Sequence, residues 1–390
     1  MTTAQTFLFF LLLLGVVAAL LRLVSQRAPA LPYQVVLAAA GILLGLLPGL
    51  HLPRVGADLI LLAFVPGLVF EAALTLDLAE LRRRALHVGL LATVGVLVGV
   101  LVMAALLRFA LGFAWPSAFI LSAIVAATDP IAVISVLRGL RAPAGLTAIL
   151  EGESLFNDGT GVAVFAAVLA SVLSGAPSLG DAAGRFLVLT VGGAAVGVVA
   201  GAASVLLLRR AQEAELEILL TLVAAYGSYL LADVLHFSGI VAVVIAGMAV
   251  ARFARRSGRL QGTQLLGFWN LLAFVLNAVL FVLVGAALPT PSLLRLVPLV
   301  IGAYLAMVVA RAPAVYGLTW WGGVPWAWRH LAFWGGLRGA LSIALALAVA
   351  ASPGIDPRVS TVAYGVVVLS LLVQGGLVVP LARRLGLSGA

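Results

Sequence analysis

Two acidic residues stand inside long apolar runs, where charged side chains are rare. Asp129 lies between Thr128 and Pro130 in one run, and Asp158 opens the apolar part of the next. A charge at mid-membrane depth costs about 2.5–3.5 kcal/mol on insertion scales, so an acid kept there indicates a functional site. Carboxylate, hydroxyl and carbonyl oxygens suit hard cations, and carboxylates also carry protons. The two runs therefore predict a cation or proton site.

The spacing around Asp158 places its polar neighbours on two faces of one helix. Ser154 and Asp158 are four residues apart and share one face, and Glu153 and Asn157 share the adjacent face. An acid with hydroxyl and amide oxygens beside it is again what a cation or proton site requires. A hydroxyl such as that of Ser154 is also compatible with a simple hydrogen bond within or between membrane helices.

The helix that carries Asp129 is expected to break. Pro130 has no backbone N–H and disfavours helical geometry at the residue before it, which frees backbone carbonyls near Thr128 for an ion. A later run is interrupted in a similar way, because Arg338 stands among glycines that weaken a helix. If the two broken helices cross, Asp129 and Arg338 face exposed helix ends and offset their partial charges.

The composition identifies the elements that must position these residues. The chain has 390 residues, of which 64% are apolar and 9% charged, and its mean hydropathy is +1.22. A soluble protein could not bury so much apolar surface, so the sequence predicts an all-α polytopic membrane protein in the lipid bilayer. Without cysteine, disulfides and thiol catalysis are excluded. The net charge of +9 is attributed to membrane orientation, and no nucleic acid is expected as a partner.

Thirteen apolar runs are long enough to cross a membrane at about 20 residues per span. The first is expected to be a retained helix, and no soluble domain is expected within residues 1–390. A short interfacial piece is expected at 313–328. The runs cover residues 4–24, 32–50, 57–76, 86–112, 116–137, 147–173, 184–208, 215–234, 238–253, 265–288, 294–312, 329–350 and 359–380.

Arginine placement supports this count. Seventeen arginines fall in one set of alternating loops and five in the other, and Arg338 lies inside a span. Basic loops stay in the cytoplasm, so we expect a plasma-membrane protein with its N-terminus outside and its C-terminus cytoplasmic. The larger set is Arg22, Arg27, Arg82, Arg83, Arg84, Arg138, Arg141, Arg209, Arg210, Arg252, Arg255, Arg256, Arg259, Arg311, Arg329, Arg383 and Arg384. The smaller set is Arg54, Arg108, Arg185, Arg295 and Arg358.

The alternation also predicts an internal repeat. With the seventh span, 184–208, as a connector helix, the first six spans start outside and the last six start inside. This arrangement gives two inverted six-helix repeats, at about 4–173 and 215–380, as in many secondary transporters. The fifth span of each repeat is the interrupted one, so spans 5 and 12 are the broken, crossing helices.

Five segments resemble the cation/proton antiporter family, in its sodium/proton exchanger branch with an Asn-Asp motif. They are LVFEAALTLDL (69–79), ATDPIAVISVL (127–137), EGESLFNDGTGVAVF (151–165), FWNLLAFVLNAVLFVLVG (268–285) and GGLRGALSIALAL (335–347). The resemblance implies a secondary transporter, not an enzyme, that exchanges Na⁺ or Li⁺ for protons by alternating access and serves pH homeostasis. It also implies a homodimer in which a core domain moves against a dimerisation domain. No cofactor is implied beyond the transported Na⁺ and H⁺.

The resemblance also implies roles for individual residues. Asp158 carries the cation or the proton, Thr128, Asp129 and Ser154 complete the Na⁺ site, and the acid at Glu71 lies near it. Glu153 is implied to pair with Arg338 and to help position Asn157. Because relatives with Asn before this Asp are usually electroneutral, a 1:1 exchange is expected.

Some interpretations stay open at this stage. Glu71 is compatible with a gate, a ligand or a buried structural acid, and the cation could be K⁺ in a K⁺/H⁺ antiporter of the same family. A cation channel would show a polar stripe over several helices, whereas the polar residues here cluster at one depth. An intramembrane hydrolase is disfavoured because no histidine lies near Ser154 in the sequence and no GxGD element is present.

Overall fold

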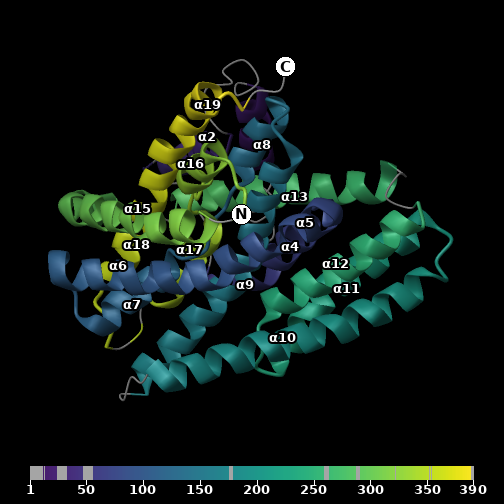
Figure 1. Ribbon diagram of the computed structural model, residues 1–390, viewed down its shortest axis with the longest axis horizontal. Coiled ribbons are helices and arrows are strands. Elements are labelled where there is room, and N and C mark those ends of the chain that lie inside the picture. The colour runs from purple at the N-terminus through teal and green to yellow at the C-terminus, as the bar shows by residue number, and fades with distance from the viewer. Residues whose placement is uncertain are drawn as a thin grey trace, which may run out of the picture.

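Helices make up all the regular structure that is described. The computed structural model (Figure 1) describes residues 12, 14–23, 33–46, 56–174, 179–258, 263–286, 290–320, 322–350, 352 and 354–387. A helix at Leu14–Leu23 comes first. The following elements are α2 (Tyr33–Leu46), α3 (Ala57–Leu59), η1 (Ile60–Phe64), α4 (Val65–Thr75), α5 (Leu78–Leu90), η2 (Leu91–Gly95), α6 (Val96–Leu111), α7 (Trp115–Ile124), α8 (Ile131–Gly139), α9 (Ala144–Leu173), α10 (Leu179–Leu208), α11 (Ala214–Val234), α12 (Gly239–Arg256), α13 (Thr263–Ala286), α14 (Thr290–Arg295), α15 (Val297–Thr319), α16 (Trp326–Trp334), α17 (Ala340–Ala348), α18 (Arg358–Leu369), η4 (Ser370–Gln374) and α19 (Gly375–Arg384).

These elements form the thirteen predicted spans. In the described part of the chain, eight helices are long and apolar enough to cross a membrane on their own, and three π-helical turns (η1, η2, η4) lie inside such helices without ending them. The other five spans are the helix at Leu14–Leu23, α2, α12 and the two broken helices. The predicted positions 4–11, 13, 24, 32, 47–50 and 287–288 lie outside the described residues.

Both broken helices are interrupted where the sequence predicted it. The first ends with α7 at Ile124 and resumes with α8, for which Pro130 is the N-cap residue. The second ends with α16, whose C-cap residue is Gly335, and resumes with α17 after Gly339. The two interruptions meet, because the backbone N–H of Asp129 donates to the carbonyl of Leu337 at 2.7 Å.

Several contacts between helices have a counterpart in the other half of the chain. The counterpart is found when each span of the first six is exchanged with the span at the same position among the last six. The second span (α2) packs on the tenth (α13), and the ninth (α12) packs in the same way on the third (α4). The two fourth-position helices, α6 and α15, pack on each other. This exchange is what two inverted repeats require. The residue boundaries of the repeats stay a prediction.

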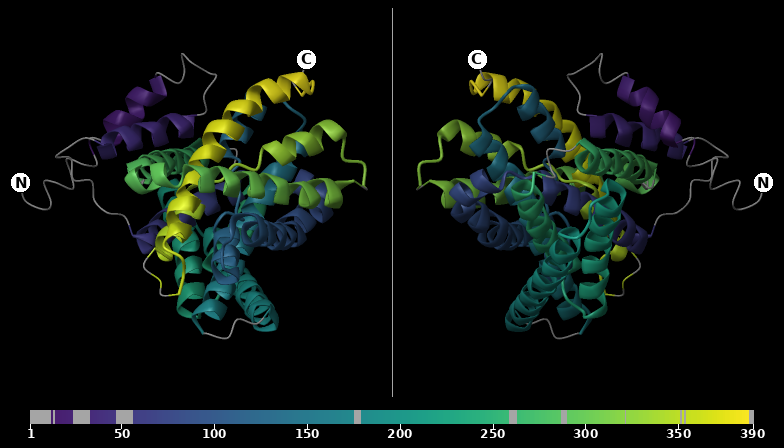
Figure 2. Two further views of the ribbon diagram at one scale, coloured as in Figure 1. Left: turned by 90° about the vertical axis from the view of Figure 1, so that its left-hand side faces the viewer. Right: turned by 90° about the vertical axis from the view of Figure 1, so that its right-hand side faces the viewer.

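One long helix occupies the centre of the molecule. α9 contacts α4, α5, α6, α7, α8, α10, α12 and α17, and it passes through the middle of Figure 1. The helices α10, α11 and α12 pack together on one side of it, as both views in Figure 2 show. Because α9 is covered on nearly every side, its polar residues face protein or cavities rather than lipid.

Two sequence-based boundaries differ clearly from the structure. The fourth span begins at Leu78, earlier than predicted, because the Asp77 carboxylate accepts from Ala79 N and Glu80 N and caps the helix start. α15 continues through Pro313 to Thr319, so the interfacial piece predicted at 313–328 is wrong over its first half. Arg311 consequently lies inside α15 and not in a loop, which changes the arginine division to sixteen against five.

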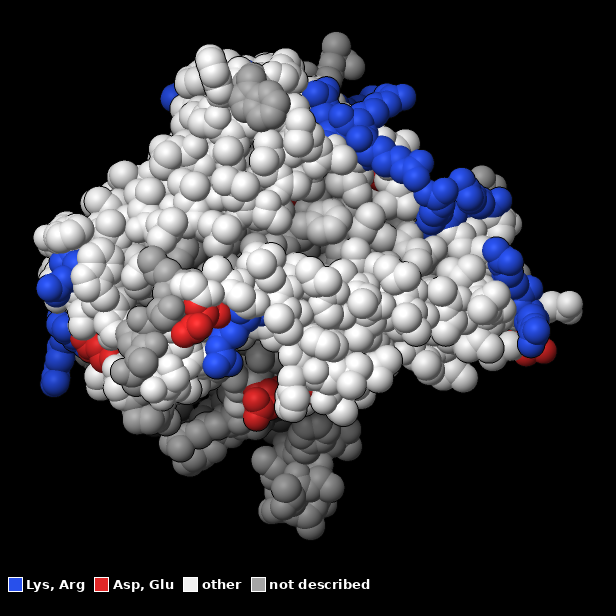
Figure 3. All heavy atoms as spheres, turned by 60° about the horizontal axis from the view of Figure 1, so that its bottom comes forward, with Lys and Arg blue, Asp and Glu red and all other residues white. Residues whose placement is uncertain are grey.

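The charged residues that are exposed lie at the borders of the apolar helices. Figure 3 shows arginine side chains gathered along one border of the molecule, with a broad uncharged surface between the charged zones. An uncharged belt is what the hydrocarbon core of a bilayer requires. Arg27, Arg54 and Arg259 lie outside the described residues.

Candidate functional site

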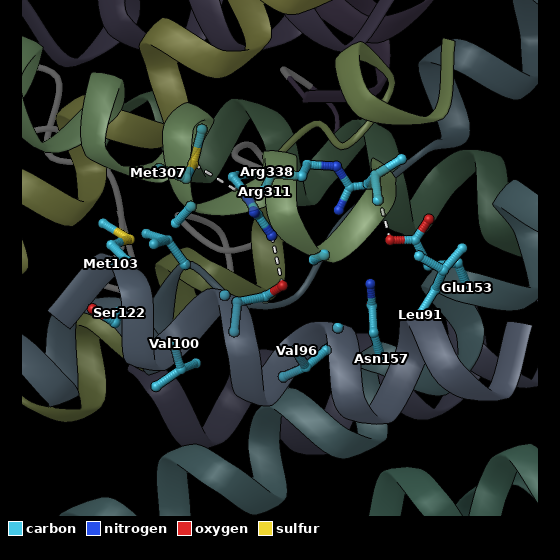
Figure 4. Close-up of a pocket in the computed structure, with 17 residues that line it drawn as sticks. Leu91, Val96, Val100, Met103, Ser122, Glu153, Asn157, Met307, Arg311 and Arg338 are labelled. Atoms are coloured by element: carbon cyan, nitrogen blue, oxygen red, sulfur yellow. Dashed lines mark hydrogen bonds and ion pairs between the residues drawn. The ribbon is translucent and has the colours of Figure 1, made fainter. Parts of the chain in front are cut away.

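The two polar faces of α9 open onto two different cavities. Ser154 and Asp158 line a large cavity of about 720 Å³. Glu153 and Asn157 line a small cavity of about 40 Å³. The two helix faces inferred from the residue spacing are therefore distinct in the structure, and each lines its own cavity. The small cavity is drawn in Figure 4.

The large cavity brings all the predicted ion-binding residues together. Thr128, Asp129, Ser154 and Asp158 line it, and Glu71 reaches it from α4. Amide side chains from α2 and α13 line it as well; these are Gln34, Asn270 and Asn277. In the described residues no group of three or more His, Cys, Asp or Glu is placed to hold a metal ion. Carboxylate, hydroxyl, amide and carbonyl oxygens of this kind are the ligands that hard cations take.

Thr128 is fixed between the helix break and α9 by three hydrogen bonds. The Ser154 hydroxyl donates to the Thr128 carbonyl at 2.5 Å. The Asn157 amide donates to Thr128 Oγ1 at 2.7 Å and accepts from the Thr128 backbone N–H at 3.2 Å. Asn157 thus holds the non-helical segment against α9.

Charged side chains lie at the exposed ends of the broken helices. The Arg338 guanidinium donates to the carbonyls of Ala126 and Ala127, just beyond the end of α7, at 2.5 and 3.0 Å. Asp129 Oδ1 accepts from the N–H of Ile131, at the start of α8, at 3.2 Å. A cation at a carboxyl end and an anion at an amino end offset the partial charges there. The predicted placement of Asp129 and Arg338 at the exposed ends of the broken helices is confirmed.

Glu153 does not pair with Arg338 as the resemblance implied. Its carboxylate lies 2.9 Å from Nη2 of Arg311, and both side chains are almost fully buried. Arg338 instead donates to the two carbonyls beyond α7 and to the sulfur of Met307 at 3.2 Å. Figure 4 shows the two arginines above Asn157, with only Arg311 bonded to Glu153. Glu153 pairs with Arg311 because the carbonyls just beyond α7 already occupy the guanidinium of Arg338.

Arg311 also caps a helix. Its guanidinium donates to the carbonyls of Ala332 and Phe333, in the last turn of α16, at 2.9 and 3.2 Å. The positive charges of the two buried arginines around the small cavity are therefore balanced by the carboxylate of Glu153 and by the carboxyl ends of two helices. Each helix end carries about half a negative charge. Buried charges with such partners are stable in a low-dielectric interior.

Two functional candidates were missed in the sequence. Arg311 was placed in a loop, although the apolar residues that continue after Pro313 signalled a longer helix. Glu151 was not singled out, although it precedes Ser154 by three residues on the same face of α9. Its carboxylate accepts from Arg138 Nη2 at 2.6 Å, and both residues line the large cavity.

Comparisons with known proteins cover nearly the whole chain. The family model described as "Sodium/hydrogen exchanger, transmembrane" matches residues 13–384. A Na⁺/H⁺ antiporter of Aphanothece halophytica is 35% identical, with 97% of this chain and 75% of that protein aligned. A Na⁺/H⁺ antiporter of Pseudomonas aeruginosa is also 35% identical, over 84% of this chain and 81% of that protein. The structure of the sodium proton antiporter from Methanocaldococcus jannaschii at pH 8 shares the fold, with a TM-score of 0.83, 22% identity, and coverage of 99% of this chain and 100% of that chain.

Proposed function

Because this chain belongs to the transmembrane sodium/hydrogen exchanger family, we propose that it exchanges Na⁺ or Li⁺ for protons across the plasma membrane. The observation that carries the proposal is the convergence of Asp158, Asp129, Thr128 and Ser154 on one wall of a large cavity. This wall offers two carboxylates, a hydroxyl and a backbone carbonyl, which together can replace the hydration shell of a monovalent cation.

Exchange follows from competition at Asp158. A protonated carboxyl group is a poor cation ligand, whereas an ionised one binds the cation together with Asp129, the Ser154 hydroxyl and the Thr128 carbonyl. Either loaded form has lower net charge than the empty site and crosses the membrane more readily. The empty, doubly charged site is held back, so the inward movement of one ion requires the outward movement of the other.

Alternating access is supported by the two cavities. The large cavity is lined by Arg138 and Arg383, which lie in the last turns of α8 and α19 and belong to the larger arginine set, so we assign it to the cytoplasmic side. In this conformation the Thr128–Asn157 hydrogen bonds lie between it and the small cavity on the adjacent face of α9. Movement of α9 with the broken helices would transfer access from one side to the other.

The exchange is proposed to be electroneutral. Asn157 precedes Asp158 at a position where a second acid would add a second titratable group, and its amide is engaged by Thr128. In this account Asp129 keeps its charge through the cycle, and its carboxylate accepts from the N–H of Ile131 at the start of α8. One proton is then exchanged for one cation.

The assembly and orientation complete the proposal. With Arg311 left out, the two arginine sets hold sixteen and five residues, and this difference supports an N-terminus outside and a C-terminus in the cytoplasm. A homodimer is proposed, in which one set of helices anchors the protein and the α9 core moves against it.

The test is proton movement in proteoliposomes on addition of each alkali cation in turn. We expect Na⁺ and Li⁺ to drive protons in the opposite direction to the cation. A response to K⁺ alone would assign the chain to K⁺/H⁺ exchange, and Na⁺ flux without proton movement would indicate a channel and overturn the proposal.

A further inference from the structure

A serine on α17 has a buried hydroxyl with no hydrogen-bond partner. Ser342 is 1% exposed, and its Oγ contacts no donor or acceptor in the described part of the chain. Other buried helix serines donate to carbonyls of their own helix: Ser122 bonds Ala118 O at 2.7 Å and Ser228 bonds Ala225 O at 3.2 Å. Ser342 stands in the first turn of α17, where the residue four positions earlier precedes the helix. The usual bond to the i−4 carbonyl of the same helix is therefore not available.

The position of Ser342 relates it to the ion site. Among the described residues five buried side-chain atoms are unpartnered, and of these residues only Ser342 lines the large cavity, together with Thr128, Asp129, Ser154 and Asp158. Gly339 lies three residues before Ser342 on the same face of α17. A Cβ on Gly339 would overlap the Asp129 carboxylate, so this face of α17 is pressed against the acid. The Ser342 hydroxyl is consequently on the α17 side of the wall that carries the two carboxylates.

A buried hydroxyl in this position needs a partner that enters the cavity. Burying a polar group without a hydrogen bond is unfavourable, and such a group in a native structure calls for an explanation. The Ser342 hydroxyl resembles the Ser154 hydroxyl in chemistry, and it differs in having no partner for its proton, since Ser154 donates to the Thr128 carbonyl. A hydroxyl oxygen is a suitable ligand for an alkali cation that is held by Asp129 and Asp158.

We propose that Ser342 is a further residue of the cation site, whose hydroxyl oxygen contacts the transported alkali cation from α17. This inference rests on the proposed exchange activity and extends it, because it gives the second broken helix a direct contact with the cation. Ligands would then come from both broken helices, and cation binding would draw them together. Ser342 would affect cation affinity and the choice between cations rather than the proton step.

The test combines three substitutions with one control. Ser342→Ala removes the oxygen, Ser342→Thr keeps it, and Ser342→Cys replaces it with a softer sulfur atom. Ser228→Ala is the matched control, because Ser228 is equally buried but lies on α11 away from the cavity. Each purified protein is assayed in liposomes for the KM and maximal rate with Na⁺, Li⁺ and Tl⁺. Its melting temperature is also recorded as a function of Na⁺ concentration, which reports binding without transport.

We expect Ser342→Ala to raise the Na⁺ KM by about five- to tenfold, with a smaller change in maximal rate. This is the loss of affinity expected when one contact as strong as a hydrogen bond is removed. Ser342→Thr should remain within about twofold of the unsubstituted protein, and Ser342→Cys should weaken Na⁺ more than Tl⁺, because sulfur is the softer ligand. The Na⁺ concentration that stabilises the Ser342→Ala protein should rise by the same factor as its KM.

Three results would overturn the inference. These are an unchanged Na⁺ KM in Ser342→Ala, an equal loss of maximal rate with every cation at constant KM, and a Ser342→Thr protein as impaired as Ser342→Ala. If Ser342→Ala does not fold, Ser342→Thr and Ser342→Cys carry the test through their Na⁺ to Tl⁺ ratios. Failure of the proposed exchange activity is distinguished because the unsubstituted protein would then also move no protons.

Discussion

Arg311 and Glu153 form a buried ion pair, with Nη2 and Oε1 2.9 Å apart, that joins α15 to α9 beside the ion site. Arg311 simultaneously caps the carboxyl end of α16. The pair therefore connects the helix that carries Asp158 to the second broken helix. Breaking it should disturb the support of the site without removing an ion ligand.

We predict that Arg311→Leu and Glu153→Leu each lower the free energy of unfolding by about 3–5 kcal/mol, because each leaves an uncompensated buried charge. The double substitution should recover part of the loss. A double-mutant cycle on thermal unfolding measures the coupling. The exposed pair Arg83–Glu80 is the control and should couple by less than about 1 kcal/mol. A coupling of Glu153 to Arg338 larger than to Arg311 would contradict the observed pairing.

Asn157→Ala should release Thr128 from α9, because both side-chain bonds between them are lost. We expect a loss of about 1–3 kcal/mol in stability and a raised Na⁺ KM, since the Thr128 carbonyl is no longer held in place. Ser122→Ala is the control, because its hydroxyl bonds only within α7. Wild-type Na⁺ KM and melting temperature in Asn157→Ala would show that Thr128 is positioned by other contacts.

Gly339→Ala should abolish or strongly slow exchange. A Cβ there would overlap the side chain of Asp129, so either the carboxylate or the start of α17 must shift. Gly317→Ala is the control, because a Cβ at Gly317 meets no atom within 4 Å, and it should behave as the unsubstituted protein. Exchange kinetics that are the same in both variants would mean that Asp129 is not held against α17.

The positions of the spans and the broken helices could be predicted from the sequence, because apolar run length and the Pro130 and glycine interruptions are local signals. The convergence of Asp129, Ser154 and Asp158 could be predicted from helical spacing and the resemblance together. The partner of Glu153 could not, because two arginines on different helices compete for it. Which one reaches the carboxylate depends on carbonyls at helix ends that are far apart in sequence.

The unpartnered hydroxyl of Ser342 illustrates a second limit. Its sequence context, a serine in an apolar helix, is ordinary, and serines such as Ser228 in similar contexts bond to their own helix. Only the start of α17 after Gly339 removes that bond. The depth at which a broken helix resumes is a tertiary property, so a local pattern does not predict it.

Electroneutral exchange predicts that the membrane potential does not drive the reaction. In liposomes, setting the potential with a potassium ionophore should leave the initial rate of Na⁺-driven proton movement unchanged. A rate that follows the imposed potential would mean that a second proton moves. Asp129→Asn and Glu71→Gln would then identify the group that carries it, because both residues line the same cavity as Asp158.

The most direct measurement is Na⁺-driven proton movement in liposomes that contain the Asp158→Asn protein. Asp233→Asn, which replaces an exposed acid at the end of α11, serves as the control. The account predicts that Asp158→Asn folds with a normal melting temperature and moves no protons, while Asp233→Asn exchanges at the unsubstituted rate. Sodium-driven proton movement retained in the folded Asp158→Asn protein would contradict the central claim that this carboxyl group carries the cation and the proton in turn.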